Sequence, residues 1–157
     1  MRVSYASSRR NYSRHKMTSL TLAQANAIIN AALQASRSAG YKPMAVVVLD
    51  ASGNVKATQR EDGASMFRVD VATGKAWAAV GMDASSRVLA ERAQGNPNFF
   101  TTLAATAQGR FLPQPGAVLI KDASGAIIGA AGASGGTGDE DEAICIAGIA
   151  AAGMQHG

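Results

Sequence analysis

The sequence predicts an α+β domain, in which helices pack on a central antiparallel sheet of about five strands. Two stretches carry this prediction, VVVLDASGNVKAT at 46–58 and VLIKDASGAIIGAA at 118–131. Each reads as two apolar strands joined by a DASG turn, which is typical of a β-hairpin. Helical patterns precede, separate and follow the hairpins, in the order α-β-β-α-α-α-β-β-α. Tight hairpins favour antiparallel pairing and disfavour a doubly wound parallel fold, which is built from strand-helix-strand units.

The first helix is expected over residues 22–39. Thr21 and Gln24 have the spacing of a capping box, in which the two side chains accept hydrogen bonds from backbone N–H groups of the first turn. Apolar residues follow at helical spacing. Gly40 is suited to the left-handed conformation that ends many helices.

The remaining elements follow from turn residues and periodicity. The strands are expected at 44–49, 54–59, 118–121 and 126–131. The later helices are expected at 67–80, ended by Gly81; at 84–93, with Asp83 as N-cap; at 98–107, after the breaker Asn96-Pro97; and from about Asp139 onward. The DASG motif that both hairpins contain allows two interpretations, an internal repeat or two uses of one favourable turn.

Residues 1–16 are expected to form a basic tail and residues 17–157 a single domain. Five of the 15 basic side chains lie in the tail, so ten remain against eleven acidic ones and the domain is about neutral. Nucleic-acid binding by the domain is therefore not expected, and we expect a cytoplasmic protein. The tail lacks the apolar middle of a secretory signal. It is a disordered extension, an arm for targeting or nucleic acid, or a start assigned too early, with Met17 as the true start.

The composition excludes several kinds of site. The longest apolar runs are a few residues long, too short to span a membrane. The single cysteine, Cys145, cannot form an internal disulfide and is expected to be a buried thiol. His15 and His156 lie near the chain ends, so the body has no histidine for a Ser-His-Asp triad or a His-rich metal site. No metal site is expected.

Five glycines precede four consecutive acids in the segment 129–142. A glycine-rich turn between a strand and a helix is a context for anion binding. This turn lacks the spacing of the phosphate-binding loops and contains no Lys or Arg. The acids would repel phosphate and are expected to interact with the helix dipole. Nucleotide binding is therefore not expected, and the glycines indicate a close approach to a small ligand, the sheet or a neighbouring subunit.

A polar cluster follows the first hairpin. Its members are Arg60, Glu61, Asp62, Arg68, Asp70 and Lys75. The cluster allows two interpretations. The charges form structural ion pairs, or Arg60 and Lys75 clamp a carboxylate-bearing ligand with Asp62 as a proton acceptor. Arg110, before Phe111-Leu112-Pro113, is a second cation on a loop.

From about Leu20 to Ala152 the chain resembles the GlcG/HbpS-like family of haem-binding and haem-degrading proteins, which is similar to the C-terminal domain of PduO-type proteins. The stretches that carry the resemblance are LTLAQANAIINAALQAS, AVVVLDASGNVKATQREDGA, KAWAA, FLPQPGAVLI and IIGAAGASGGTGDEDEAICIAG. The resemblance implies an antiparallel sheet of profilin-like or PAS-like appearance. It also implies dimers or larger homo-oligomers, and haem binding in some members.

The resemblance also implies site residues. The family's RMDGA element matches residues 60–64, with Glu61 in place of the usual methionine, and its KA element matches Lys75 and Ala76. The SGG element matches residues 134–136, and the acidic helix start matches Asp141 and Glu142. One departure is that the first helix lacks the histidine that some haem-binding members use. Other candidate iron ligands are Tyr41, Met44, Met66 and Met82.

Three functions are weighed. The first is binding of haem or a small, anionic ligand, with a haem-degrading or accessory role in small-acid metabolism; its candidate binding residues are Arg60, Glu61, Arg110, Ser134, Gly135 and Gly136. The second is a cofactor-free enzyme acting on a small carboxylic acid by proton transfer or hydrolysis. Asp62 and Lys75 are its candidate catalytic residues, and amides near Ser134 would stabilise an oxyanion. The third is a structural or accessory subunit of a homo-oligomer.

Overall fold

The computed structural model describes residues 18–157, so the predicted tail lies outside the described residues. In the described chain five helices pack on a five-stranded antiparallel sheet of order β2-β1-β4-β3-β5, which confirms the predicted α+β class. The helices are α1 (Leu22–Ala39), α2 (Phe67–Met82), α3 (Ser86–Gly95), α4 (Pro97–Thr106) and α5 (Gly138–Ala151). The strands are β1 (Ala45–Asp50), β2 (Val55–Arg60), β3 (Ala117–Lys121), β4 (Ile127–Ser134) and β5 (Gln155–His156).

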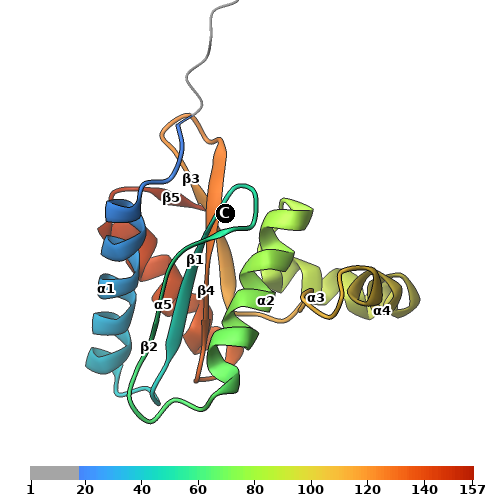
Figure 1. Cartoon of the computed structure of the whole chain (residues 1–157), viewed down its shortest axis with the longest axis horizontal. Helices are drawn as coiled ribbons and strands as arrows, with labels where there is room; N and C mark the ends of the chain where they lie inside the picture. The colour runs from blue at the N-terminus through green and yellow to red at the C-terminus, as the bar shows by residue number, and fades with distance from the viewer. Residues whose placement is uncertain (1–17) are drawn as a thin grey trace, which may run out of the picture.

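The helices cover both faces of the sheet (Figure 1). On one face α1 and α5 enclose a core of large aliphatic side chains, which includes Ile28, Ile29, Ile144 and Ile149. On the other face α2 packs through small residues against Val47, Leu49 and Leu119. Beyond α2, the helices α3 and α4 extend away from the sheet around a third apolar cluster. No helix in the described part of the chain combines the length and apolar character that crossing a membrane requires.

The helix α2 lies unusually close to the sheet because both surfaces are made of small residues. A Cβ built on Gly132 of β4 would lie 2.4 Å from the carbonyl oxygen of Ala72 and 3.0 Å from the Cβ of Ala76. No side chain larger than hydrogen fits there without moving the helix. This close contact fixes the distance between α2 and the sheet. It therefore also fixes where the polar residues of α2 lie relative to the end of β4.

The two hairpins share one turn structure. In each, one carboxylate oxygen of the first turn residue (Asp50 or Asp122) accepts N–H hydrogen bonds of 2.9–3.0 Å from the residues two and four positions later. Gly53 and Gly125 both have positive φ, +79° and +84°. However, the equivalent strands β1 and β3 differ in position, since β1 pairs with β2 and β4 whereas β3 pairs with β4 and β5. The topology therefore favours two uses of one turn over an internal repeat.

Most element boundaries agree with the prediction to within about two residues, and three assignments differ. Gly81 does not end α2 but lies within it. The predicted role of Asp83 is wrong: this residue has φ +50° and ends α2, and Ser85 precedes α3. The strand β5 was not predicted, because two residues carry no periodic signal. It is held in place by hydrogen bonds between the backbones of Leu119 and Gly157, in addition to its own pairing with β3.

Candidate functional site

The glycine-rich turn leads into α5 through a capping box that was not among the predicted features. Thr137 and Glu140 form a capping box, with hydrogen bonds of 3.2 Å and 2.9 Å between each side chain and the other residue's backbone N–H. The neighbouring acids also have partners, because Asp139 and Glu142 both bind Arg87 of α3. The hydrogen bond with Asp139 and the charge of Glu142 raise the pKa of Arg87. The acidic run thus serves to start α5 and to attach α3 to it.

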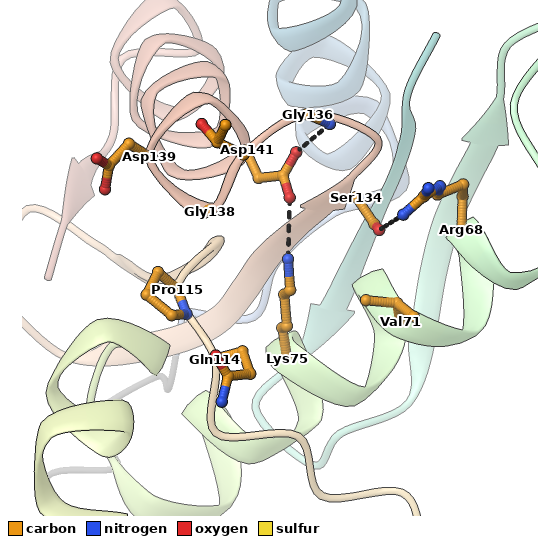
Figure 2. Close-up of a pocket in the computed structure, with 11 residues that line it drawn as sticks. Arg68, Val71, Lys75, Gln114, Pro115, Ser134, Gly136, Gly138, Asp139 and Asp141 are labelled. Carbon is orange, nitrogen blue, oxygen red and sulfur yellow. Dashed lines mark hydrogen bonds and ion pairs between the residues drawn. The ribbon is translucent and has the colours of Figure 1, made fainter. Parts of the chain in front are cut away.

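The remaining acid of the run, Asp141, forms a buried ion pair with Lys75 of α2 (Figure 2). The Lys75 Nζ lies 2.9 Å from Asp141 Oδ2, and the side chains are only 6% and 3% exposed. Lys75 also donates to the carbonyl of Ala133 at 3.2 Å, and Asp141 Oδ1 accepts from the N–H of Gly136 at 3.0 Å. The pair therefore holds α2, the end of β4, the glycine-rich turn and α5 together.

Gly116 makes room for this ion pair. A Cβ at this position would lie 2.7 Å from Lys75 Nζ and 3.0 Å from Asp141 Cβ, and the residue has φ +131°. Both the space and the backbone conformation therefore require glycine. The loop before β3 closes over the pair in this way and leaves it inaccessible from that side.

A polar cavity of about 350 Å³ opens above the ion pair. Its floor comes from α2, where Arg68, Val71 and Lys75 share one face because they are three and four residues apart (Figure 2). The other walls come from the loop at Gln114, the end of β4 and the first turn of α5. Arg68 donates a hydrogen bond of 3.4 Å to the hydroxyl of Ser134, which is itself 1% exposed.

A second, more apolar cavity lies on the other side of α2. It has a volume of about 580 Å³, and its walls include Val55, Val71, Trp77 and Leu112. A smaller cavity of about 220 Å³ adjoins it and is lined by Met82, Leu103 and Phe111. Trp77 and Arg110 border both cavities, and the Arg110 guanidinium carbon lies 4.5 Å from the centre of the Trp77 ring. The two cavities are thus separated by one stacked pair of side chains.

The structure distributes the predicted site residues among several places. Lys75, Ser134 and Gly136 line the polar cavity, and Arg110 borders the apolar ones. A Cβ on Gly135 would lie 2.3 Å from the carbonyl oxygen of Pro43, so this glycine serves a close backbone contact.

The Arg60–Asp62 segment lies elsewhere, in a separate cavity of about 370 Å³ between β2 and α1. Glu61 accepts from the N–H of Met44 at 3.0 Å and lies 3.4 Å from Arg37, and Arg60 donates to the carbonyl of Ala64. The described chain does not bring Arg60 or Asp62 to the cavity of Lys75. A joint role for Asp62 and Lys75 in catalysis thus stays a prediction.

Comparison with known proteins identifies the relatives of this fold and site. A family model described as "Haem degrading protein HbpS-like" matches residues 20–150. The chain belongs to the HbpS-like family. The crystal structure of a PduOC–haem complex aligns with a TM-score of 0.79 and 26% identity, over 88% of this chain and 98% of that chain.

Two crystal structures of HbpS also align with this HbpS-like chain, one of them a double mutant from Streptomyces reticuli. Both are 30% identical to it, with TM-scores of 0.75 for the double mutant and 0.74 for the other. They cover 95% and 94% of this chain, and 97% of their own. A search of the curated proteins found no match.

Sequence patterns alone do not single out three of the residues that the structure places at these cavities. Arg68 was assigned only to the polar cluster, although its spacing from Lys75 places both on one helical face. Only the family resemblance distinguishes Asp141, together with Glu142, from the neighbouring acids, and its partner Lys75 is 66 residues away in sequence. Trp77 was read only as part of a helical motif, and its contact with Arg110 depends on where the loop before β3 lies.

Cys145 confirms the prediction of a buried thiol. The residue is fully buried in the core of α1, α5 and the sheet, and burial raises the pKa of its thiol. Its sulfur contacts the carbonyl oxygen of Gly116 at 3.7 Å. The buried sulfur has no contact with solvent or with the cavities, so the structure gives this cysteine no nucleophilic role.

The raised pKa of Cys145 predicts a loss of stability in mild alkali. Above about pH 8.5 the thiol ionises in the unfolded chain but not in the folded one, so the unfolded state gains about 1.4 kcal/mol per pH unit. Below that pH the thiol is neutral in both states, so it causes no loss of stability. We expect the free energy of unfolding, measured in urea between pH 7 and 10, to fall more steeply for the wild type than for Cys145→Ala. Equal slopes would contradict the burial of the thiol.

Proposed function

We propose that this chain binds haem, in the apolar cavity bordered by Trp77 and Arg110. The observation that carries the proposal is this cavity in a chain of the HbpS-like family. A relative of 26% identity is named for its complex with haem, and the family is described as haem-degrading. In this proposal the protein acts in the cytoplasm, and it forms a homo-oligomer, as resemblance to the family implies.

The cavity residues suit the organic part of haem. The apolar walls at Val71, Trp77 and Leu112 suit the porphyrin ring, and Arg110 is the cation that would pair with a propionate. When bound, haem would supply a redox-active iron. Asp70 also lines the cavity, and its negative charge would repel the propionates. This repulsion favours a haem orientation in which the propionates point away from Asp70 and toward Arg110.

The iron has one candidate ligand near this cavity among the described residues. Of the predicted candidates, Met44 is fully buried, Met66 lies 76% exposed at the start of α2, and Tyr41 packs against the core of α1. Met82 lines the smaller cavity, next to Trp77 and Arg110. The smaller cavity adjoins the proposed haem cavity at Trp77 and Arg110, so Met82 is the residue to test as an axial ligand.

A hemin titration of the full chain tests the proposal. We expect a saturable Soret band at one haem per subunit, with parallel quenching of the fluorescence of Trp77, the only tryptophan in the chain. Arg110→Ala should weaken binding about two- to fivefold, as expected for the loss of a partly exposed ion pair. Met82→Leu conserves the side-chain volume, so it should shift the Soret band and leave the stoichiometry unchanged.

Arg92→Ala is the matched control, because Arg92 is an exposed arginine of α3 that does not line these cavities. Its titration should superimpose on that of the wild type. Absorbance that grows without saturation, or unquenched Trp77 fluorescence at saturation, would show that haem does not occupy this cavity.

A further inference from the structure

We propose that the polar cavity above the Lys75–Asp141 pair is a second binding site, which takes a small monocarboxylate through Arg68. This site is separate from the proposed haem cavity. The two share only Val71 among their lining residues, and they lie on different sides of α2. The proposal therefore does not rest on haem binding.

The charges around the cavity leave Arg68 available to a ligand. Lys75 is neutralised by Asp141, and Asp139 on the rim is bound by Arg87, which it shares with Glu142. In the part of the chain that the structure describes, no carboxylate lies within 4.0 Å of the Arg68 guanidinium. A guanidinium carries five N–H donors, and Arg68 uses one of them on Ser134. The remaining donors can receive a carboxylate in the two-bond geometry that arginine favours.

The surroundings of Arg68 restrict the charge and size of this ligand. One cation without a partner balances one negative charge. Arg87, Asp139 and Glu142 together carry one net negative charge at the rim, which would repel a second charge on the ligand. A monocarboxylate is thus favoured over phosphate or a dicarboxylate. The volume of about 350 Å³ is at the small end of ligand pockets. Val71 and Pro115 provide apolar surface for a short hydrocarbon body.

Ser134 would orient the ligand. Its hydroxyl accepts a hydrogen bond from Arg68, and its own proton is then free to point into the cavity. By contrast, the N–H of Gly136 already binds Asp141 and cannot serve the ligand. The buried Lys75–Asp141 pair holds α2 against the glycine-rich turn, so the site is built before the ligand arrives.

Calorimetric titration of the haem-free, full-length protein with butyrate tests this site, with inorganic phosphate as the competing class. We expect saturable binding of butyrate at one per subunit and weaker or no binding of phosphate. Arg68→Gln should weaken butyrate binding about tenfold or more, because it removes a charged, two-bond contact. Arg68→Lys keeps the charge but cannot form the two-bond contact. Its affinity for butyrate should therefore lie between those of the wild type and Arg68→Gln.

Arg92→Gln provides the matched control, with the same substitution at an exposed arginine outside the cavity. It should bind butyrate as the wild type does, and far-ultraviolet circular dichroism should show that all variants are folded. The hemin titration of Arg68→Gln should be unchanged, so the two proposals fail separately. The site is overturned if butyrate does not bind, if Arg68→Gln binds it as tightly as the wild type, or if phosphate binds better.

Discussion

Lys75→Met is expected to lower the free energy of unfolding by about 3–5 kcal/mol, because it leaves the carboxylate of Asp141 buried without its cation. Asp141 is 3% exposed, so water cannot replace the lost partner. The Gly136 N–H still binds one carboxylate oxygen, but it supplies no full charge. A loss of this size is a large part of the stability of an ordinary domain, which is about 5–15 kcal/mol. Urea denaturation at pH 7 measures it.

Two further variants separate the effect of breaking the ion pair from the effect of removing a lysine. Lys42 is exposed and forms no ion pair with the described residues, so Lys42→Met should change stability by no more than about 0.5 kcal/mol. The double variant Lys75→Met/Asp141→Leu removes both charges and should recover most of the loss. If Lys75→Met were as stable as Lys42→Met, the pair would not be buried as described.

Gly132→Ala is expected to destabilise the protein by about 1–3 kcal/mol or more, since the added methyl has no space. Its Cβ would lie 2.4 Å from the Ala72 carbonyl oxygen, which is backbone and cannot rotate away. The helix α2 would have to move outward, and Lys75 would move with it. A thermal or urea melt of the variant measures the effect.

Gly81→Ala is the matched control for this substitution, because Gly81 lies in α2, the helix that Gly132 contacts, and its Cβ would meet nothing within 4 Å. Replacing a helical glycine by alanine should stabilise the protein by about 0.5–1 kcal/mol. The two glycines should therefore respond with opposite signs. A neutral Gly132→Ala would mean that α2 can shift away from β4 at little cost, contrary to the packing described.

The fold was predictable where local chemistry decides it. The Thr21–Gln24 capping box and the left-handed Gly40 lie where the sequence predicts them, and both cap α1. The DASG turns form hairpins because the Asp carboxylate accepts N–H hydrogen bonds from the turn and the Gly adopts positive φ. Asp83 was misassigned because an Asp that follows one helix and precedes another suits two roles, and here it adopts the left-handed conformation that ends α2.

The site was less predictable, because it depends on residues that are distant in the chain. Lys75 was selected from its small apolar neighbours, but its partner Asp141 could not be told apart from the adjacent acids. Which of these acids turns toward the sheet depends on how α5 is rotated about its axis. The sequence does not fix this rotation, because α5 is apolar on most sides. Arg60 and Lys75 lie 15 residues apart, yet β2 and α2 carry them to different cavities.

The order of the sheet has a consequence for association by strand addition. One edge is protected, since β5 pairs with part of β3. The other edge, β2, has no strand partner on its outer side among the described residues. Its six residues are VKATQR, with Lys56, Gln59 and Arg60 among them. Polar and charged side chains on a short edge strand oppose pairing with other chains. The open edge is therefore one that resists aggregation.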